Sequence, residues 1–323
     1  MKILITGGAG FLGQRLAKRL LARGVLAGPD GAPQRIRELV LLDVVKGDDF
    51  GDPRVTTHVG DIATRATLER AIDAGTLPIF HLAAIVSGQA EADFELGVRI
   101  NLDASRQLLD VCRALGHRPR VVFTSSVAVY GGALPDVVRD DTALNPQSSY
   151  GVQKAIAELL LSDYTRRGFV DGRVLRLPTI SVRPGRPNAA ASSFASGIIR
   201  EPLNGERAAC PVPGGTRLWL LSPRRAIDAL VVGCELDDAQ LGAARAINLP
   251  GLSVSVDEMI DALREVAGEP VAARIDHAPD ARIMRIVGGW PARWDTSRAE
   301  HLGFTGDAGF ADVIRDHLAD ARR

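Results

Sequence analysis

The fold is decided near the amino terminus by the stretch Ile3-Leu4-Ile5-Thr6-Gly7-Gly8-Ala9-Gly10-Phe11-Leu12-Gly13. Its apolar run from Lys2 to Thr6 predicts a buried parallel strand, because such a strand is covered on both faces and loses polar alternation. Gly7 permits a tight turn, Gly10 lets backbone approach a pyrophosphate, and Gly13 lets the next helix pack close to the sheet. That helix presents its free N–H groups and positive dipole end to phosphate. The stretch therefore predicts a nucleotide-cofactor site.

The residues that follow support this prediction against the alternative of a glycine turn that binds nothing. Leu16 and Leu20 recur at helical spacing, and a second apolar strand, 39–42, ends in Asp43, which completes the dinucleotide-binding order of strand, glycine turn, helix, strand and acid. Asp43 lies 30 residues after Gly13, rather than the usual ~20, and we expect the Gly/Pro-rich stretch 28–33 to be an inserted loop. A carboxylate at Asp43 would bind the adenosine ribose and repel a 2′-phosphate, which predicts NAD rather than NADP. The alternative is that Asp43 only starts a turn.

Composition excludes several classes of function. Lys+Arg and Asp+Glu both number 39 among 323 residues, so no nucleic-acid partner is indicated. The sequence contains no apolar run of membrane-spanning length and no signal peptide at its start. The three cysteines are far apart and the six histidines form no ligand cluster, which predicts reduced thiols, no metal site and a cytoplasmic protein.

Strands and helices alternate through the first half of the chain, which predicts an α/β fold with a doubly wound parallel sheet. The expected strands are 2–6, 39–42, 55–59, 77–84, 120–126 and 172–180, and the expected helices are 63–74, 97–115 and 148–167. After Pro184 the sequence becomes rich in loop residues, followed by expected helices at 224–236, 256–266 and 310–321 and a strand at 246–249. We therefore expect a cofactor-binding domain over 1–183, to which part of the later chain returns, and a smaller, mainly substrate-binding lobe over 184–323.

Acid–base chemistry is indicated by Tyr150 and Lys154, which a spacing of four places on one helix face. A phenol titrates near pH ~10 and is a poor base at neutrality, but a neighbouring ammonium favours the phenolate. Ser126, at the end of the preceding strand, can bind the same substrate oxygen. Together these groups can move a proton on or off an alcohol while a hydride leaves its carbon. His81 lies in an apolar strand and is expected to be a satisfied core histidine rather than a base.

At this point the chain resembles the extended short-chain dehydrogenase/reductases over essentially its full length. The resemblance is carried by the segments 6–13, 60–62, 81–84, Asn101, 124–126 with 129–131, Tyr150 with Lys154, and 183–185. It implies that Ser126, Tyr150 and Lys154 are catalytic and that Lys154 also binds the nicotinamide ribose. It also implies a set of cofactor-binding residues: Gly7, Gly10, Phe11, Leu12, Gly13, Asp43, Asp61, Ile62, Ala83, Asn101, Ser125, Tyr150, Lys154 and Thr179.

A narrower resemblance, to the D-erythronate dehydrogenase group, lies in segments 85–94, 187–197 and 216–225. It implies oxidation of the C2 hydroxyl of a small sugar acid, a substrate whose carboxylate a planar guanidinium at Arg217 could bind through two hydrogen bonds. Ser87, Gln89, Ser126 and Asn188 are expected to bind its hydroxyls. The alternative for Arg217 is a pairing with a surface acid.

Two other functions stay open. A nucleotide-sugar epimerase or dehydratase of the UDP-glucose 4-epimerase type would use the same residues and return the hydride to its substrate. A non-catalytic NAD-sensing scaffold would have no use for Ser126, Tyr150 and Lys154. Related enzymes pair the helices 97–115 and 148–167 with those of a symmetry mate, so the resemblance also implies a homodimer, although the same apolar residues could face only the parent sheet.

Overall fold

The computed structural model describes residues 1–185 and 190–321, which divide into two compact units. Unit 1 comprises residues 1–129, 148–176 and 227–247, and unit 2 comprises 130–147, 177–226 and 248–323. The chain passes between the units several times, so neither unit is one continuous stretch of sequence.

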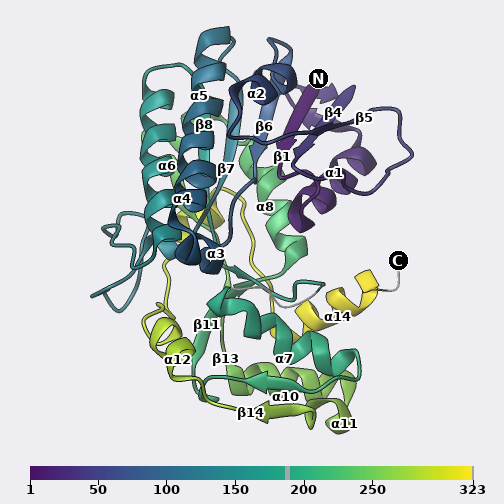
Figure 1. Ribbon diagram of the computed structural model, residues 1–323, viewed down its shortest axis with the longest axis vertical. Coiled ribbons are helices and arrows are strands. Elements are labelled where there is room, and N and C mark those ends of the chain that lie inside the picture. The colour runs from purple at the N-terminus through teal and green to yellow at the C-terminus, as the bar shows by residue number, and fades with distance from the viewer. Residues whose placement is uncertain (186–189, 322–323) are drawn as a thin grey trace. The chain divides into compact units, whose positions relative to one another are not determined.

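Unit 1 is built on a seven-stranded sheet in the order β12-β8-β7-β6-β1-β4-β5 (Figure 1). Its strands are β1 (Lys2–Thr6), β4 (Glu38–Asp43), β5 (Val55–Val59), β6 (Thr76–His81), β7 (Arg120–Ser126), β8 (Asp171–Leu177) and β12 (Ala246–Asn248). Parallel pairing joins β1 to β4 and β6, β4 to β5, and β6 to β7. The doubly wound parallel sheet predicted from sequence is confirmed.

The order of strands reverses at β1. From β1 the chain builds outward through β4 and β5, and it then returns to the other side of β1 with β6, β7, β8 and β12. In open α/β sheets, ligands bind outside the carboxyl ends of the strands at such a switch point. The switch point here lies between the carboxyl ends of β1 and β6, where Thr6 is in register with His81.

Helices cover both faces of this sheet. The helices of unit 1 are α1 (Phe11–Arg23), α2 (Arg65–Ala71), α3 (Ser87–Ala92), α4 (Phe94–Gly97), the π-helix η1 (Val98–Asp103), α5 (Ala104–Leu115), the short 3-10 turn η2 (Val127–Val129), α6 (Ser149–Arg166), most of α8 (Pro223–Glu235) and α9 (Asp238–Leu241). Apolar residues of α2, α5 and α6 share one core with side chains of β1, β4 and β7. On α1 and α8, Arg19 pairs with Asp228 and Arg23 with Glu235.

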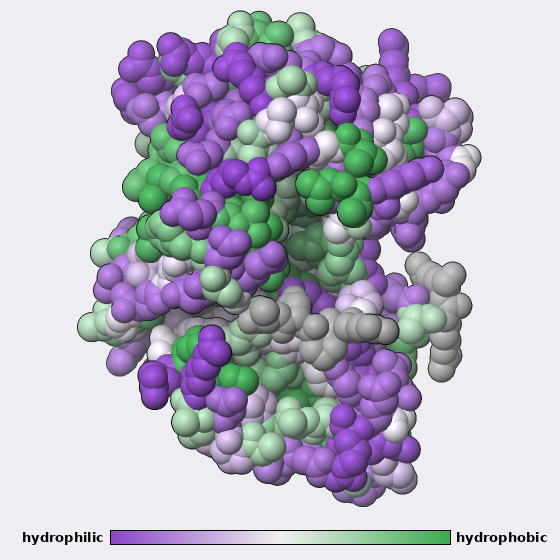
Figure 2. All heavy atoms as spheres, viewed as in Figure 1, coloured by the Kyte–Doolittle hydropathy of each residue, from purple (hydrophilic) through white to green (hydrophobic). Residues whose placement is uncertain are grey.

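One face of α6 carries apolar side chains that the described residues leave partly exposed. Val152, Ile156 and Leu159 are 42%, 38% and 66% exposed, and they recur at helical spacing. Green, hydrophobic spheres lie along the left edge in Figure 2, where Figure 1 draws α6. The apolar residues of this helix therefore do not all face the parent sheet.

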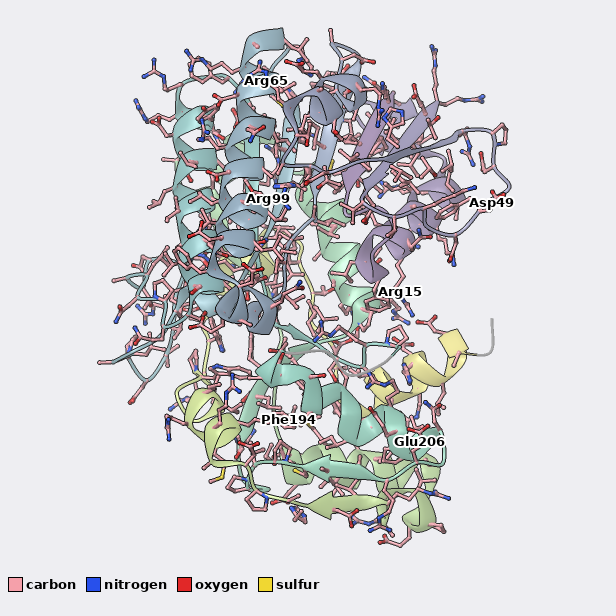
Figure 3. The ribbon with its side chains drawn as sticks, in the orientation of Figure 1. Arg15, Asp49, Arg65, Arg99, Phe194 and Glu206 are labelled. Carbon is pink, nitrogen blue, oxygen red and sulfur yellow. The ribbon has the colours of Figure 1, made fainter. Side chains whose placement is uncertain are left out.

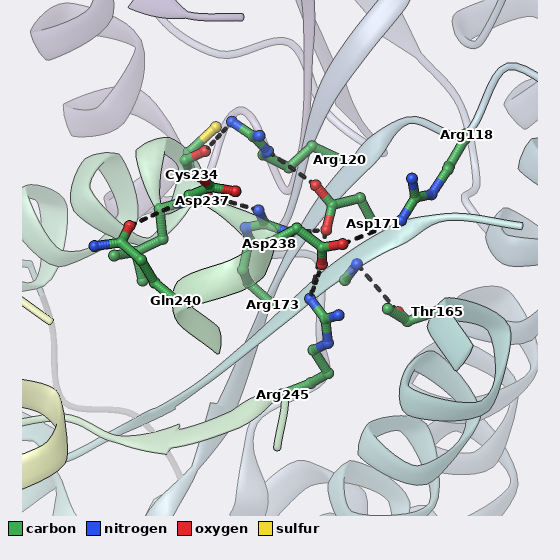
Figure 4. A network of polar contacts seen from close by, with 12 residues as sticks. Arg118, Arg120, Thr165, Asp171, Arg173, Cys234, Asp237, Asp238, Gln240 and Arg245 are labelled. Carbon is green, nitrogen blue, oxygen red and sulfur yellow. Dashed lines mark hydrogen bonds and ion pairs between the residues drawn. The ribbon is translucent and has the colours of Figure 1, made fainter. Parts of the chain in front are cut away.

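The amino ends of β7 and β8 are held by a charged cluster, drawn in Figure 4. Asp171 pairs with Arg120, Arg173 and Arg245, and Arg245 also pairs with Asp238. The fully buried Arg173 donates a further hydrogen bond to the carbonyl of Leu236, 2.7 Å away. Because buried guanidinium groups need such partners, the cluster fixes β8 against the residues that precede β12.

Several expected elements differ from the structure. The strand expected over 77–84 ends at His81, and the helix expected over 63–74 is confined to Arg65–Ala71. The strand expected over 172–180 is wrong in part, because it stops at Leu177 before Pro178, and residues Thr179–Ile180 form a separate strand, β9, in another sheet. Proline removes a backbone donor, so it ends the pairing of β8. The inserted loop 28–33 lies at the tip of a hairpin of β2 (Val25–Ala27) and β3 (Pro33–Arg35).

Unit 2 has its own core and small sheets. Its three-stranded sheet has the order β13-β11-β9, and β10 pairs with β14. The elements are β9, η3 (Ala191–Ser193), α7 (Phe194–Leu203), β10 (Ala208–Cys210), β11 (Arg217–Leu221), β13 (Leu252–Ser255), α10 (Val256–Ala267), α11 (Glu269–Ala272), β14 (Ile275–His277), α12 (Ala281–Val287), α13 (Ser297–His301) and α14 (Phe310–Ala321). Buried side chains of α7, α10 and α14 form one apolar cluster, which includes Ile198, Met259 and Ile314.

Candidate cofactor and catalytic site

The glycine loop of unit 1 has the geometry of a phosphate cradle. Gly7 has a φ of 71°, which disfavours any residue with a side chain, and a Cβ on Gly13 would overlap the carbonyl oxygen of Gly7. α1 begins immediately after Gly10, which is its N-cap residue, and no side chain caps this helix. The first amides of α1, which include those of Phe11 and Leu12, are therefore directed at the loop. These residues fit the pyrophosphate of a dinucleotide.

Asp43 is joined to this loop. Its carboxylate accepts hydrogen bonds from the backbone N–H of Ala9 at 3.0 Å and of Val44 at 2.7 Å. The Asp43 side chain at the end of β4 therefore stabilises the turn that follows β1. It does not merely start a local turn after β4. Val44 and Val45 are exposed and bring no cation to the carboxylate.

Asp61 and Ile62 follow the end of β5. Asp61 accepts a hydrogen bond from the guanidinium of Arg99 on η1 and another, 2.8 Å long, from the N–H of Ala63. Burial raises the pKa of the Asp61 carboxyl, but these hydrogen bonds outweigh it and hold the pKa below its usual value. Ile62 is buried in the core. Figure 3 labels Arg99 and also Arg15, whose guanidinium lies 4.7 Å from the ring centroid of Phe11.

His81 is a satisfied core histidine, as the sequence predicts. Its Nδ1 lies 2.8 Å from Thr6 Oγ1 and its Nε2 lies 2.9 Å from Ser105 Oγ. Burial, and to a smaller extent the charge of Lys154, lower the pKa of this imidazole to about 3, so the ring is neutral at physiological pH. The hydroxyl of Thr6 also accepts a hydrogen bond from the N–H of Ala83, 3.3 Å away. Ala83 therefore lies at the switch point, beside the turn at Gly7.

Asn101 connects three segments of unit 1. It lies in η1, where it accepts a hydrogen bond from the N–H of Ile85 at 2.8 Å and donates to the Ile85 carbonyl at 3.1 Å. Its amide also donates to Oε1 of Gln153 on α6, 2.7 Å away. A π-helical turn inside a helix is frequent at functional sites. Here it interrupts the helix expected over 97–115 and places Asn101 between the end of β6 and the helix of Tyr150.

Lys154 is buried at the carboxyl end of β7. Ser148 caps α6 by accepting a hydrogen bond from the N–H of Gly151, so Tyr150 lies in the first turn and Lys154 one turn later. The ammonium donates to the carbonyl of Thr124 at 2.8 Å, and it lies 5.7 Å from the ring centroid of Tyr150 and 4.6 Å from that of Phe123. Only 2% of Lys154 is exposed, and burial lowers the pKa of its ammonium to about 7 although the charge of Glu158 opposes the shift.

The two serines at the end of β7 differ. Ser126 is half-buried, and its hydroxyl oxygen accepts a hydrogen bond from the N–H of Ala128 at 3.1 Å, an arrangement that leaves the hydroxyl proton to be donated elsewhere. Ser125 is buried, and its hydroxyl has no hydrogen-bond partner within the described chain. Ser126 is thus suited to bind a substrate oxygen, while an orphaned hydroxyl at Ser125 fits a lining position.

The expected substrate residues lie on different elements. Ser87 begins α3 and Gln89 lies exposed on it, both in unit 1. Arg217 lies on β11 in unit 2, as does Thr179 on β9, a residue that is expected to bind the cofactor. Asn188 lies outside the described residues. Arg217 donates to Oε1 of Glu258 at 2.7 Å and to the Ser253 carbonyl at 3.2 Å, so in this structure it is paired with a surface acid.

Sequence reasoning missed three buried polar residues of α6 and β8: Gln153, Glu158 and Arg176. The carboxylate of Glu158 accepts hydrogen bonds from Nε and Nη2 of Arg176. A signal for Glu158 was present, because residues 150, 154 and 158 share one face of a helix. Arg176 has no such signal, because only the tertiary fold brings β8 beside α6.

Comparison with known proteins assigns the family. Residues 3–221 match the model of the NAD dependent epimerase/dehydratase family. The chain belongs to this family. It is therefore an NAD-dependent oxidoreductase that acts on a CH–OH group, and the family and cofactor predicted from sequence are confirmed.

The similar proteins cover almost the whole chain. The chain is 65% identical over 321 residues to D-erythronate dehydrogenase of Cupriavidus necator, and the matched region covers 99% of each protein. It is 47% identical to D-erythronate dehydrogenase of Haemophilus influenzae, over 98% of this chain and 99% of that protein. Among solved structures, a nucleoside-diphosphate-sugar epimerase from Agrobacterium tumefaciens matches with a TM-score of 0.93 and 46% identity, over 99% of this chain and 94% of that one.

No helix among residues 1–185 and 190–321 is long and apolar enough to cross a membrane. The same described residues contain no group of three or more His, Cys, Asp or Glu that could hold a metal ion. All three cysteines are free and buried.

Proposed function

We propose that this protein oxidises the C2 hydroxyl of D-erythronate, a small 2-hydroxy sugar acid, to 2-dehydro-D-erythronate with NAD. The observation that carries the proposal is the identity of 65% over 99% of both chains with a protein named D-erythronate dehydrogenase. The buried Lys154 beside Tyr150 supports it, because an alcohol dehydrogenase needs a base whose proton affinity is set by a nearby cation.

Tyr150 is the proposed proton acceptor, and it takes the hydroxyl proton of the substrate as the C2 carbon is oxidised. Lys154 favours the phenolate by its positive charge and binds the nicotinamide ribose. Ser126 donates a hydrogen bond to the same substrate oxygen and orients it, since its own oxygen is already bound by the N–H of Ala128. Bound NAD supplies the acceptor for the hydride that leaves C2.

We propose that the cofactor is bound by the residues expected from the sequence. The glycine loop with the first turn of α1 would bind the pyrophosphate, and Asp43 the adenosine ribose. The remaining residues of the assignment are Asp61, Ile62, Ala83, Asn101, Ser125, Tyr150, Lys154 and Thr179. Within unit 1, the hydrogen bond from Ala9 to Asp43 supports the pairing of the acid with the loop.

Arg217 is the proposed partner of the substrate carboxylate, with Ser87, Gln89, Ser126 and Asn188 as partners of the hydroxyls. Glu258, which now pairs with Arg217, is itself a carboxylate and is half exposed. A substrate carboxylate would replace the Glu258 carboxylate as the partner of Arg217, because the two groups have the same charge and geometry. Arg217→Lys keeps the charge but loses the planar fork, so the KM for the acid is expected to rise about tenfold while the KM for NAD stays unchanged. Equal KM values for the acid in wild type, Arg217→Lys and Arg217→Ala would remove Arg217 from the site.

The second candidate is a nucleotide-sugar epimerase, which the similarity to the Agrobacterium tumefaciens structure favours. The two functions differ in the fate of the hydride, because an epimerase returns it to its substrate and accumulates no NADH. The test supplies NAD with a panel of four-carbon sugar acids and UDP-sugars and follows NADH by absorbance. We expect steady NADH formation with D-erythronate and none with Tyr150→Phe. Faster turnover of a UDP-sugar than of any sugar acid would favour the epimerase.

We also propose a cytoplasmic homodimer and the division into a cofactor domain, 1–183, and a mainly substrate-binding lobe, 184–323. The dimer is supported by the exposed apolar face of α6, formed by Val152, Ile156 and Leu159. A twofold contact that pairs this face with its copy would bury it, and twofold closure is the commonest arrangement of soluble oligomers.

A further inference from the structure

A buried ion pair lies one helical turn beyond Lys154. Glu158 on α6 and Arg176 on β8 are 2% and 4% exposed. The guanidinium of Arg176 donates from Nε to Oε1 of Glu158 at 3.1 Å and from Nη2 to Oε2 at 2.8 Å. This is the two-pronged geometry that holds a carboxylate most firmly.

Packing alone does not account for this pair. Removing two charges from water is unfavourable, and a buried ion pair can often be replaced by apolar residues without loss of stability. Three neighbouring buried positions of α6, Ala155, Ala157 and Leu161, are apolar. α6 could therefore pack against the sheet without Glu158, so the presence of a buried carboxylate at this position needs another explanation.

The spacing supplies one. Tyr150, Lys154 and Glu158 follow each other at intervals of four, so they form one stripe along α6, and Arg176 stands at its end. Among the described residues, the ammonium of Lys154 lies close to the Thr124 carbonyl and Phe123 ring of β7 and to the Tyr150 ring of its own helix. None of these carries a full negative charge.

The charged and titratable groups that act on Lys154 can be named for each packed element of unit 1. His81 on β6 is neutral, because burial holds its pKa near 3. Arg176 on β8 is a cation whose charge is directed at Glu158. Glu158, on α6 itself, is the anion whose charge opposes the effect of burial on Lys154.

We propose that Glu158 is a positioning residue that keeps Lys154 in its ammonium form, and that Arg176 limits this effect by neutralising part of the Glu158 charge. The proposed function enters this inference at one point only: it requires the ammonium of Lys154 to favour the phenolate of Tyr150. Neither Glu158 nor Arg176 is assigned a contact with substrate or cofactor.

The two partners therefore act on Lys154 with opposite signs. Burial lowers the pKa of Lys154 to about 7, and the Glu158 carboxylate keeps it from falling further. Glu158→Gln removes this anion, so the pKa of Lys154 is expected to fall. Arg176→Gln leaves the carboxylate free to act on Lys154 alone, so the pKa is expected to rise. A role in stability alone predicts no such opposition.

The sequence makes a direct measurement simple. The chain contains four lysines, Lys2, Lys18, Lys46 and Lys154. Labelling lysine with carbon-13 at the ε position gives four NMR signals, and Lys154→Arg identifies the signal of Lys154 by its loss. Titration of the full chain without substrate or NAD then reports the pKa of Lys154 in each variant. Because no turnover is involved, the result is independent of whether D-erythronate is the substrate.

We expect the pKa of Lys154 to fall by about 1 or more in Glu158→Gln and to rise by about 1 in Arg176→Gln. The double variant removes both charges of this ion pair, and the pKa of Lys154 in it should lie between those of wild type and Glu158→Gln. Asp171→Asn is the matched control, since it disrupts a buried ion pair of unit 1 at the amino ends of the strands and should leave the pKa of Lys154 unchanged. An unchanged pKa in both single variants, or shifts in the same direction, would overturn the proposal.

Discussion

At the scale of single residues, Lys154 is the most constrained group of the site. A buried ammonium is unfavourable for the fold, and the chain retains it beside Tyr150, with a hydrogen bond to the Thr124 carbonyl. Proteins commonly accept a loss of stability where a charged group serves the reaction. Lys154 should therefore reduce the free energy of unfolding while it supports turnover.

Lys154→Met is accordingly expected to stabilise the protein and to abolish activity. The pKa of Lys154 is about 7 in the folded chain, against a reference of 10.5. Below pH ~7 the penalty for the buried charge is fully present. It falls as the pH rises above ~7, because the folded state has then lost the proton that the unfolded state still binds, and it is gone above the unfolded value. The variant should be more stable than wild type by about 2–4 kcal/mol at neutral pH, with the difference shrinking towards pH ~10.

Urea denaturation at one protein concentration and several pH values measures this difference. A variant that is less stable than wild type at neutral pH, or a difference that grows with rising pH, would show that burial does not disfavour the Lys154 charge.

Asp43 is the second residue whose charge can be tested by substitution. Asp43→Asn removes the charge that repels a 2′-phosphate and keeps one acceptor oxygen, so it can retain the hydrogen bond from the N–H of Ala9 or of Val44 but not both. The ratio of kcat/KM for NAD to that for NADP is expected to fall about tenfold or more. Asp48→Asn changes an exposed acid on the following loop and is the control. If the ratio moved equally in both variants, Asp43 would not be the residue that discriminates.

At the scale of elements, the strand, glycine turn and helix of residues 2–23 could be predicted because local chemistry determines them. Local structure alone explains the apolar run of the first strand, the glycines of the turn and the acid after the second strand, so these features can be recognised without knowing the tertiary fold. β4, β7, α6 and α14 were also confirmed, with ends within one residue of those expected.

Elements fixed by tertiary pairing were not predictable. β11 and β13 pair antiparallel over Arg217–Leu220 and Leu252–Ser255, segments that are distant in the sequence and show no hairpin signal. The π-helical turn at Asn101 depends on its hydrogen bonds to Ile85 and Gln153. In the site, Tyr150 and Lys154 could be predicted from their spacing of four residues. The pairing of Arg217 with Glu258 and of Arg176 with Glu158 could not, because these residues are brought together only by the tertiary fold.

The glycine turn gives a prediction at this scale. Gly13→Ala places a Cβ against the backbone carbonyl of Gly7, which has no flexible side chain that could move away. We expect a loss of about 2–4 kcal/mol in the free energy of unfolding and a much weaker affinity for NAD. Gly309→Ala, where a Cβ meets nothing within 4 Å, is the control. Unchanged NAD binding by calorimetry in a folded Gly13→Ala would mean that close packing of α1 is not needed for the cradle.

At the scale of the whole molecule, the chain should assemble through α6. Leu159 is 66% exposed, an unusual state for a leucine flanked by Val152 and Ile156 on the same helix. Leu159→Asp would place a charge in the proposed twofold contact, where it faces its own copy. Light scattering at micromolar concentration is expected to give the mass of a dimer for wild type and of a monomer for this variant. A monomeric wild type would contradict the assembly.

The oxidation at C2 is the central claim, and the transfer of a label tests it most directly. D-erythronate carrying deuterium at C2 is incubated with NAD and the protein, and the reduced cofactor and the acid are analysed by mass spectrometry. We expect deuterium from C2 to appear in the reduced cofactor, in amounts equal to the 2-dehydro acid formed, and we expect Tyr150→Phe to give neither product. Reduced cofactor without deuterium, or no reaction of the acid while a UDP-sugar is converted, would contradict the claim.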